Sequence, residues 1–155
     1  MEIRSARQDD AAEICSVLRR SITELCIADH HNDPQILDPW LANKTSDNLR
    51  AWIVRDGQTY RVAVIEGQIA GIGAVSATEG VLLNYVSPDF QYRGVSKALM
   101  VTLENWLKEQ GQSVSCLTST ATARKFYGKI GYLPDGKPQM GRSGSPTFPM
   151  RKQLG

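Results

Sequence analysis

Hydrophobic and polar residues alternate along the chain with two different periods, and each change of period marks a predicted element. Residues 2–7 alternate as an edge strand does, and residues 8–25 change to helical spacing. Asp10 followed by Glu13 predicts a capping box at the start of this helix. The apolar face of the helix consists of Ile14, Val17, Leu18, Ile22 and Leu25.

Polar residues interrupt this pattern before the first internal strands. Two prolines and several Asp and Asn residues within residues 28–40 favour a loop that carries short helical turns. Residues 45–54 return to helical spacing, with Thr45 or Ser46 as the N-cap and an end before Gly57. We therefore expect helices and turns, and no strand, between residue 8 and Gly57.

Apolar strands and helices alternate in the rest of the chain. Residues 59–66 and 68–77 form a predicted hairpin that turns at Glu66 and Gly67, and residues 81–86 form a third strand. The further predicted elements are a helix from Gly94 to Gly111 with Val95, Leu99, Leu103 and Trp106 or Leu107 on one stripe, a strand over residues 113–119, a helix over residues 121–130 and a strand over residues 147–152. This order predicts an α/β or α+β fold with helices on both faces of the middle strands.

Composition limits the classes of protein that this chain can represent. Residues 1–155 are expected to form one domain, and 41% hydrophobic with 22% charged residues is typical of a globular protein. A net charge of only +2 argues against a nucleic-acid or membrane partner. Cys15, Cys26 and Cys116 lack the spacing of a metal site and indicate reduced core thiols. The charged residues 1–10 lack the apolar core of a signal peptide, so we expect a cytoplasmic protein without a membrane span.

Residues 91–100 (QYRGVSKALM) link an apolar strand to a helix. Such a turn presents unpaired backbone N–H groups and the positive end of the helix dipole, which together bind phosphate. Gly94 would let the backbone approach a phosphate closely, and the small side chain of Ser96 would not block the same approach there. Arg93 and Lys97 add positive charge. A plain turn with a solvated basic face would explain the same residues. The stretch matches neither the dinucleotide fingerprint nor the P-loop.

Two motifs in order identify a family resemblance. Residues 84–111 and 117–136 resemble the GNAT (GCN5-related N-acetyltransferase) superfamily over about half of the chain. QYRGVS at residues 91–96 corresponds to the Gln/Arg-x-x-Gly-x-Gly/Ala turn of that family, although Ser96 replaces the usual Gly or Ala. Phe126-Tyr127 with Gly131-Tyr132 resembles its FY…GF/GY element. The resemblance implies a mixed central sheet of about six or seven strands, helices on both faces, and a splay between the fourth and fifth strands.

The same resemblance implies an acetyl-CoA-dependent N-acetyltransferase that acts on a primary amine of a small molecule or peptide by direct attack. The residues implied for the pyrophosphate of coenzyme A are Tyr92, Arg93, Gly94, Val95, Ser96 and Lys97. Backbone groups of Asn84, Tyr85 and Val86 would pair with the pantetheine arm, and an N–H near Val86 would polarise the thioester carbonyl. Homodimers are common in this family. The alternative function is a GNAT-fold module that binds or senses acyl-CoA without turnover.

Acetyl transfer benefits from one acid and one base. Tyr127 is the acid candidate, since a phenol stays protonated at neutral pH, although a core tyrosine beside Phe126 fits the same position. The base has no assignment. The candidates are Glu79, His30, His31 and a chain of water molecules, with exposed loop side chains as the alternative reading of the three residues.

Two residues depart from the family pattern. Thr120 stands where many members have an asparagine that binds pantetheine, and a hydroxyl replaces only part of an amide's hydrogen-bonding capacity. Ser115 stands where some members place a glutamate base.

The acceptor is expected between residues 28–40 and 134–148. Asp29, Asp33 and Asp38 could attract a cationic amine there, or could form a solvated acidic loop.

Overall fold

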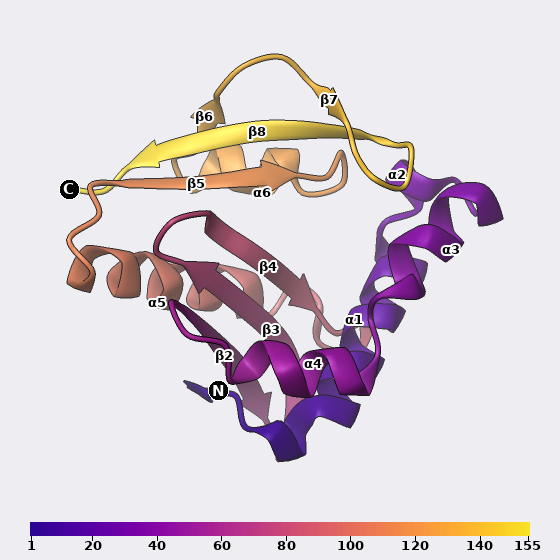
Figure 1. Ribbon diagram of the computed structural model, residues 1–155, viewed down its shortest axis with the longest axis horizontal. Coiled ribbons are helices and arrows are strands. Elements are labelled where there is room, and N and C mark those ends of the chain that lie inside the picture. The colour runs from indigo at the N-terminus through magenta and orange to yellow at the C-terminus, as the bar shows by residue number, and fades with distance from the viewer.

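Hydrogen bonds divide the strands into two antiparallel sheets (Figure 1). The structure is a computed structural model that describes residues 1–155. One sheet has the order β1–β2–β3–β4, and the other has the order β5–β8–β6 with β7 also on β8. The strands are β1 (Glu2–Ser5), β2 (Gln58–Ile65), β3 (Gln68–Ser76), β4 (Gly80–Val86), β5 (Val114–Ser119), β6 (Leu133–Pro134), β7 (Gln139–Met140) and β8 (Pro146–Gln153).

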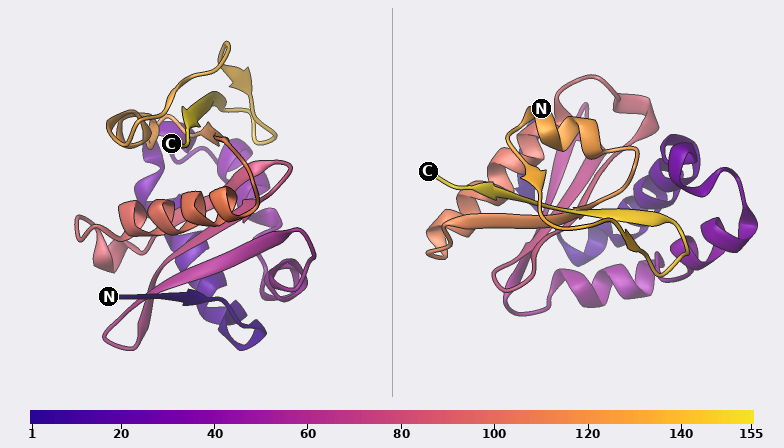
Figure 2. Two further views of the ribbon diagram at one scale, coloured as in Figure 1. Left: turned by 90° about the vertical axis from the view of Figure 1, so that its left-hand side faces the viewer. Right: turned by 90° about the horizontal axis from the view of Figure 1, so that it is seen from above.

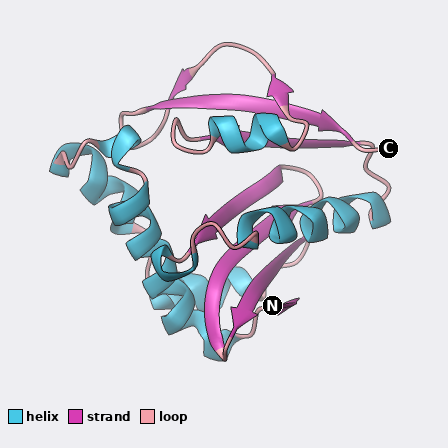
Figure 3. Ribbon diagram, turned by 180° about the vertical axis from the view of Figure 1, so that it is seen from behind, coloured by secondary structure: helices cyan, strands magenta, loops and turns pink.

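Helices cover both faces of the first sheet, as the order of elements predicts. The helices are α1 (Ala11–Leu25), α2 (Ile27–His30), α3 (Pro34–Ala42), α4 (Ser46–Ile53), α5 (Val95–Glu109) and α6 (Arg124–Lys129), with 3-10 turns η1 (Gln8–Asp10) and η2 (Pro88–Phe90). Val62 faces a cluster with α1 and α4, whereas its neighbour Ala63 faces α5. Helices α5 and α6 lie on the same side of the molecule (Figure 3). No helix has the length and apolarity that crossing a membrane requires.

The two sheets meet at β4 and β5, which are not hydrogen-bonded to each other. Both strands run in the same general direction and diverge along their length (Figure 1). They are in tight contact at Gly80, where an added Cβ atom would lie 2.2 Å from the Cys116 carbonyl oxygen. Only glycine fits this contact, and its φ of +88° also favours glycine. The splay implied by the family resemblance is therefore present, but it separates two antiparallel sheets instead of lying within one mixed sheet.

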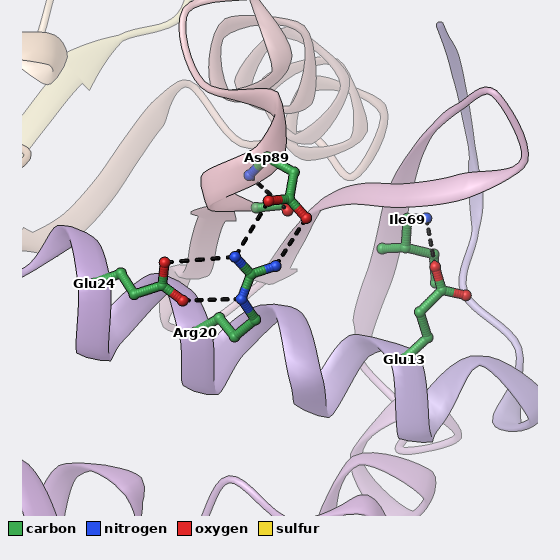
Figure 4. Close-up of polar contacts among 6 residues, drawn as sticks. Glu13, Arg20, Glu24, Ile69 and Asp89 are labelled. Atoms are coloured by element: carbon green, nitrogen blue, oxygen red, sulfur yellow. Dashed lines mark hydrogen bonds and ion pairs between the residues drawn. The ribbon is translucent and has the colours of Figure 1, made fainter.

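The predicted capping box at the start of α1 is wrong because both carboxylates bind groups outside α1. The Asp10 carboxylate pairs with the Arg4 guanidinium at 2.8 Å and accepts the Arg7 N–H at 2.7 Å. This pairing with Arg4 holds the pKa of Asp10 below its usual range. Glu13 reaches across to β3 and accepts the Ile69 N–H at 2.7 Å (Figure 4). Helix α1 is thereby fixed to the first sheet from its first turn.

Residues 28–40 are more helical than predicted. Asp33 caps α3 by accepting the Gln35 N–H at 3.0 Å, and Pro34 fits the first turn, where no N–H donor is needed. Pro39 lies inside α3, although proline normally ends a helix.

Two further predictions have opposite outcomes. The N-cap of α4 is Thr45, one of the two residues predicted for it. Cys116 was expected to be a thiol in the core, and it is exposed.

Candidate active site

A cavity of about 440 Å³ opens where β4 and β5 diverge. It is lined by these strands, by the turn that leads into α5, and by α6. The residues predicted to bind the cofactor that line it are Asn84, Tyr85, Val86, Tyr92, Gly94, Val95, Ser96, Lys97 and Thr120, and Tyr127 lines it as well. Arg93 does not line it, and its guanidinium lies 5.5 Å from the centre of the Phe90 ring. The fold thus brings both sequence motifs to one cavity.

The turn before α5 has the geometry of an anion site. Gly94 has a φ of +77° and Tyr92 a φ of +62°, so two left-handed residues bend the chain around its own N–H groups. Backbone N–H groups from Tyr92 to Lys97 have no backbone or side-chain acceptor, and the N-cap Gly94 provides none. Successive unpaired N–H groups at the start of a 15-residue helix form a concavity that favours negative charge.

An ion-pair cluster fixes the segment that precedes this turn. Arg20 of α1 binds Asp89 at 2.8 Å and Glu24 at 2.9 Å, as Figure 4 shows. Ser87 accepts the Asp89 N–H at 3.2 Å. The Arg20 guanidinium holds the pKa of Asp89 below its usual range. Although exposed pairs contribute little to stability, the two-oxygen contact orients η2 and the turn that follows it.

The edge of β4 that faces β5 is free to bind an extended ligand. Ser87 donates its N–H to Ala70 of β3, so these residues form a hydrogen-bonded pair. Paired and unpaired positions alternate along an antiparallel ladder, and the N–H and C=O groups of Val86 and Asn84 therefore point away from β3. An extended chain could add to this edge as a further strand would.

Asn84 and Tyr127 form a polar pair at the wall of the cavity. Asn84 Nδ2 donates to Tyr127 Oη at 3.4 Å, which leaves the phenolic proton able to point elsewhere. Burial raises the pKa of Tyr127 to about 12, and the Asn84 contact opposes this shift. Asn84 Oδ1 is buried without a hydrogen-bond partner. Such an acceptor fits the amide N–H of a pantetheine arm, so the residues present suit coenzyme A.

Thr120 and Ser115 are both engaged in local structure. Thr120 Oγ1 accepts the Ala123 N–H at 3.1 Å and so stabilises the turn into α6. Ser115 is fully buried and lines no part of the cavity. Its hydroxyl lies 2.7 Å from Tyr132 Oη, which donates to Glu104 of α5 at 2.9 Å. Ser115 is therefore one member of a polar chain through the core.

None of the three candidate base residues lines the cavity. His30 is fully buried, contrary to the exposed position that the sequence suggests. Its Nδ1 accepts the Asn32 N–H at 2.9 Å and its Nε2 lies 2.9 Å from the Ile22 carbonyl, so both ring nitrogens are used. His31 and Glu79 are exposed, and Glu79 adjoins the end at which β4 and β5 close.

A second cavity of about 230 Å³ adjoins the first and shares part of its wall. The shared residues are Tyr85, Thr118, Ser119 and Thr120. Its outer wall comes from the end of α3 and from the β7–β8 loop, which approaches the α2–α3 segment (Figures 1 and 2). Lys44 and Arg142 line it beside Trp40. Sequence reasoning missed the two cations, since about 100 residues separate them and no local pattern joins them.

The acidic residues predicted to attract the acceptor do not face this cavity as free charges. Asp29 is buried, and its carboxylate accepts N–H groups of Ala121 at 2.6 Å and Thr122 at 3.2 Å. Asp33 caps α3, and Asp38 is exposed outside the cavity. The expectation of an acidic acceptor site is therefore not supported.

Buried phenol and thiol groups predict a loss of stability at alkaline pH. Burial raises the pKa of Tyr60, Tyr127 and Cys26 to about 12. As pH rises, the unfolded chain releases these protons first, so stability is full below about pH 9 and falls toward pH 12. Each group adds a slope of up to about 1.4 kcal/mol per pH unit, between its ordinary pKa of 9.0 for Cys26 or 10.0 for the tyrosines and its raised pKa of about 12.

Urea unfolding at pH 8 and pH 11 measures this effect. The double variant Tyr60→Phe/Tyr127→Phe should lose less stability between the two pH values than the wild-type protein. Equal unfolding free energies at both pH values would contradict the assignment.

Comparisons with known proteins agree with the resemblance in the sequence. The family model of the acetyltransferase (GNAT) domain matches residues 27–154. The GCN5-related N-acetyltransferase "Aminotransferase, Class-II" from Rhodopseudomonas palustris has a TM-score of 0.87 at 22% identity, with 99% of this chain and 95% of that chain covered. PaiA N-acetyltransferase from Thermoplasma acidophilum, solved with coenzyme A, has a TM-score of 0.80 at 20% identity, with 99% and 98% covered. No curated protein sequence matches significantly.

Proposed function

Because the chain belongs to the GNAT family of acetyltransferases, whose acyl donor is acetyl-CoA, we propose that it acetylates a primary amine of a small molecule or peptide by direct transfer. One observation supports this most strongly. Two cavities meet along the shared wall at Tyr85 and Thr118–Thr120, so a donor in one and an acceptor in the other would touch. Bound acetyl-CoA supplies the thioester carbonyl that the amine attacks.

The larger cavity is the proposed donor site. Backbone N–H groups of Tyr92 to Lys97 hold the pyrophosphate, and the side chain of Lys97 adds a charge at the cavity wall. The open edge of β4 pairs with the pantetheine arm, to which Asn84 Oδ1 offers an acceptor. The Val86 N–H, which points away from β3, polarises the thioester carbonyl.

Tyr127 is the proposed acid. Its oxygen already accepts a hydrogen bond from Asn84, so its own proton is available to the departing sulfur atom. With a pKa of about 12, the phenol stays protonated at every pH at which an enzyme of this kind works. No carboxylate or imidazole in either cavity is free to act as the base, and the amine therefore loses its proton to solvent water.

The alternative function, an acyl-CoA-binding module without turnover, rests on Ser115 and Thr120. Ser115 lies outside both cavities, so its replacement of a glutamate does not argue against catalysis here. The cytoplasmic location remains a prediction of the sequence, and a homodimer remains a possibility that the family resemblance implies.

Thermal denaturation with CoA and with acetyl-CoA tests the donor site, since ligands that bind only the folded state raise its melting temperature. We expect both compounds to raise it. Release of free CoA from acetyl-CoA, measured with a thiol reagent over a panel of amines, then tests transfer. Absence of any shift would contradict the donor site, and a shift without turnover on any amine would favour the binding module.

A further inference from the structure

The second cavity differs from the first in its polarity and charge. Its lining holds the charged residues Lys44, Arg142 and Asp29 and several hydroxyl side chains, beside the rings of Trp40 and Tyr85 and two prolines. Its volume of about 230 Å³ is below the range of roughly 300–1,000 Å³ that suits drug-sized ligands. It therefore suits a small polar molecule better than a long or apolar one.

Neither cation of this cavity has a carboxylate partner. The ion pairs of the structure join other residues, and Lys44 Nζ donates only to the Trp40 carbonyl at 3.3 Å and to Asn43 Oδ1 at 2.7 Å. Burial and the nearby positive charge of Arg142 lower the pKa of Lys44. Two cations without an ion-pair partner thus line one small cavity, with Lys44 half-buried and Arg142 exposed.

Asp29, the one carboxylate of the lining, forms no ion pair with either cation. Both of its oxygens are used by the turn before α6, through the N–H groups of Ala121 and Thr122 and the Thr122 hydroxyl. The β7–β8 loop that carries Arg142 is held by two backbone hydrogen bonds, from Gly141 to the Ser145 carbonyl and from Gly144 to the Gly141 carbonyl. Lys44 and Arg142 therefore remain without a carboxylate at ion-pair distance.

We infer that the acceptor is a small amine that also carries a carboxylate, with the carboxylate between Lys44 and Arg142 and the amine at the shared wall near Tyr85. This inference rests on the proposed acetyl transfer and names the substrate class of the same site. Arginine and lysine side chains bind carboxylates by charge-assisted hydrogen bonds, and the guanidinium of Arg142 can do so with two of its N–H groups.

The test compares paired acceptors that differ only in the carboxylate. Turnover is measured with glycine, alanine and glutamate and with their methyl esters, on the wild-type protein and on Lys44→Met and Arg142→Met. Lys137→Met is the control, because Lys137 is exposed in the same segment and lines neither cavity. We expect the free acids to be preferred, and each cavity variant to raise KM for the acids by about 10- to 100-fold. The esters and the control should be unaffected.

A binding measurement separates this inference from the proposed function. Isothermal titration of the CoA-loaded protein with N-acetylglycine reports the carboxylate site without turnover. If no amine is acetylated but N-acetylglycine binds the wild-type protein and not the Lys44→Met/Arg142→Met variant, the transfer activity fails and the carboxylate site stands. If amines are acetylated but esters react as well as acids, the inference is overturned and the transfer activity stands.

Discussion

Replacing Tyr127 by phenylalanine is expected to lower kcat by about 10²- to 10⁴-fold, the usual contribution of a general acid or base, with little change in the Kd of CoA. The substitution removes one oxygen atom, whose one hydrogen bond in the protein is to Asn84. The ring keeps its edge-to-face contacts with Phe126 at 5.2 Å and Tyr132 at 5.7 Å between ring centres. The cavity should therefore keep its shape and lose its proton donor.

Tyr60→Phe is the matched control for this prediction. Tyr60 is as buried as Tyr127, and burial raises the pKa of both phenols to about 12, but Tyr60 lines neither cavity. Its variant should keep full kcat. If Tyr127→Phe also keeps full kcat while CoA still binds, Tyr127 is a core tyrosine and another group supplies the proton.

Gly94→Val is expected to weaken CoA binding by about 5- to 30-fold. A branched side chain in the left-handed conformation costs about 1–2 kcal/mol, and the free turn should relax away from it. Binding must then restore the φ of +77° that aligns the N–H groups. An added Cβ atom meets no other atom within 4 Å, so the effect comes from backbone conformation and not from a clash.

Helix α5 provides a control at its other end. Gly111 has a φ of +82° and, like Gly94, has no atom within 4 Å of an added Cβ. Gly111→Val should therefore cost similar stability and leave the Kd of CoA unchanged. Equal losses of CoA affinity in both variants would show that Gly94 acts through overall stability and not through the anion-binding turn.

The central elements could be predicted because their hydrophobic periods are clear and their contacts are local. The hairpin at Glu66 and Gly67 and the stripe that begins at Val95 and Leu99 lie where the sequence places them. The donor cavity followed from two motifs whose relative order carries the family resemblance. Their meeting in one cavity required the fold, since the turn and Tyr127 belong to different elements.

Residues 28–40 were misjudged for a physical reason. Asp29 and His30 look like loop residues because they are polar, yet both are buried and bonded to groups outside α2. A polar side chain can be buried at little cost when its partners are in place, and partners in other elements are invisible to local pattern. The same limitation hid Lys44 and Arg142, whose proximity depends on the path of the β7–β8 loop.

The polar chain through the core has a mechanical consequence for catalysis. Glu104 of α5 binds both Tyr132, just beyond α6, and Lys152 of β8, the latter at 2.9 Å. Ser115 of β5 completes the chain through Tyr132. The helix that begins at the anion-binding turn is thereby braced against the elements that carry Tyr127, across the gap between the sheets. Buried hydrogen bonds therefore fix the distance between the pyrophosphate site and the proton donor. The site is assembled before the acyl donor binds, so the protein can bind it without closing one sheet over the other.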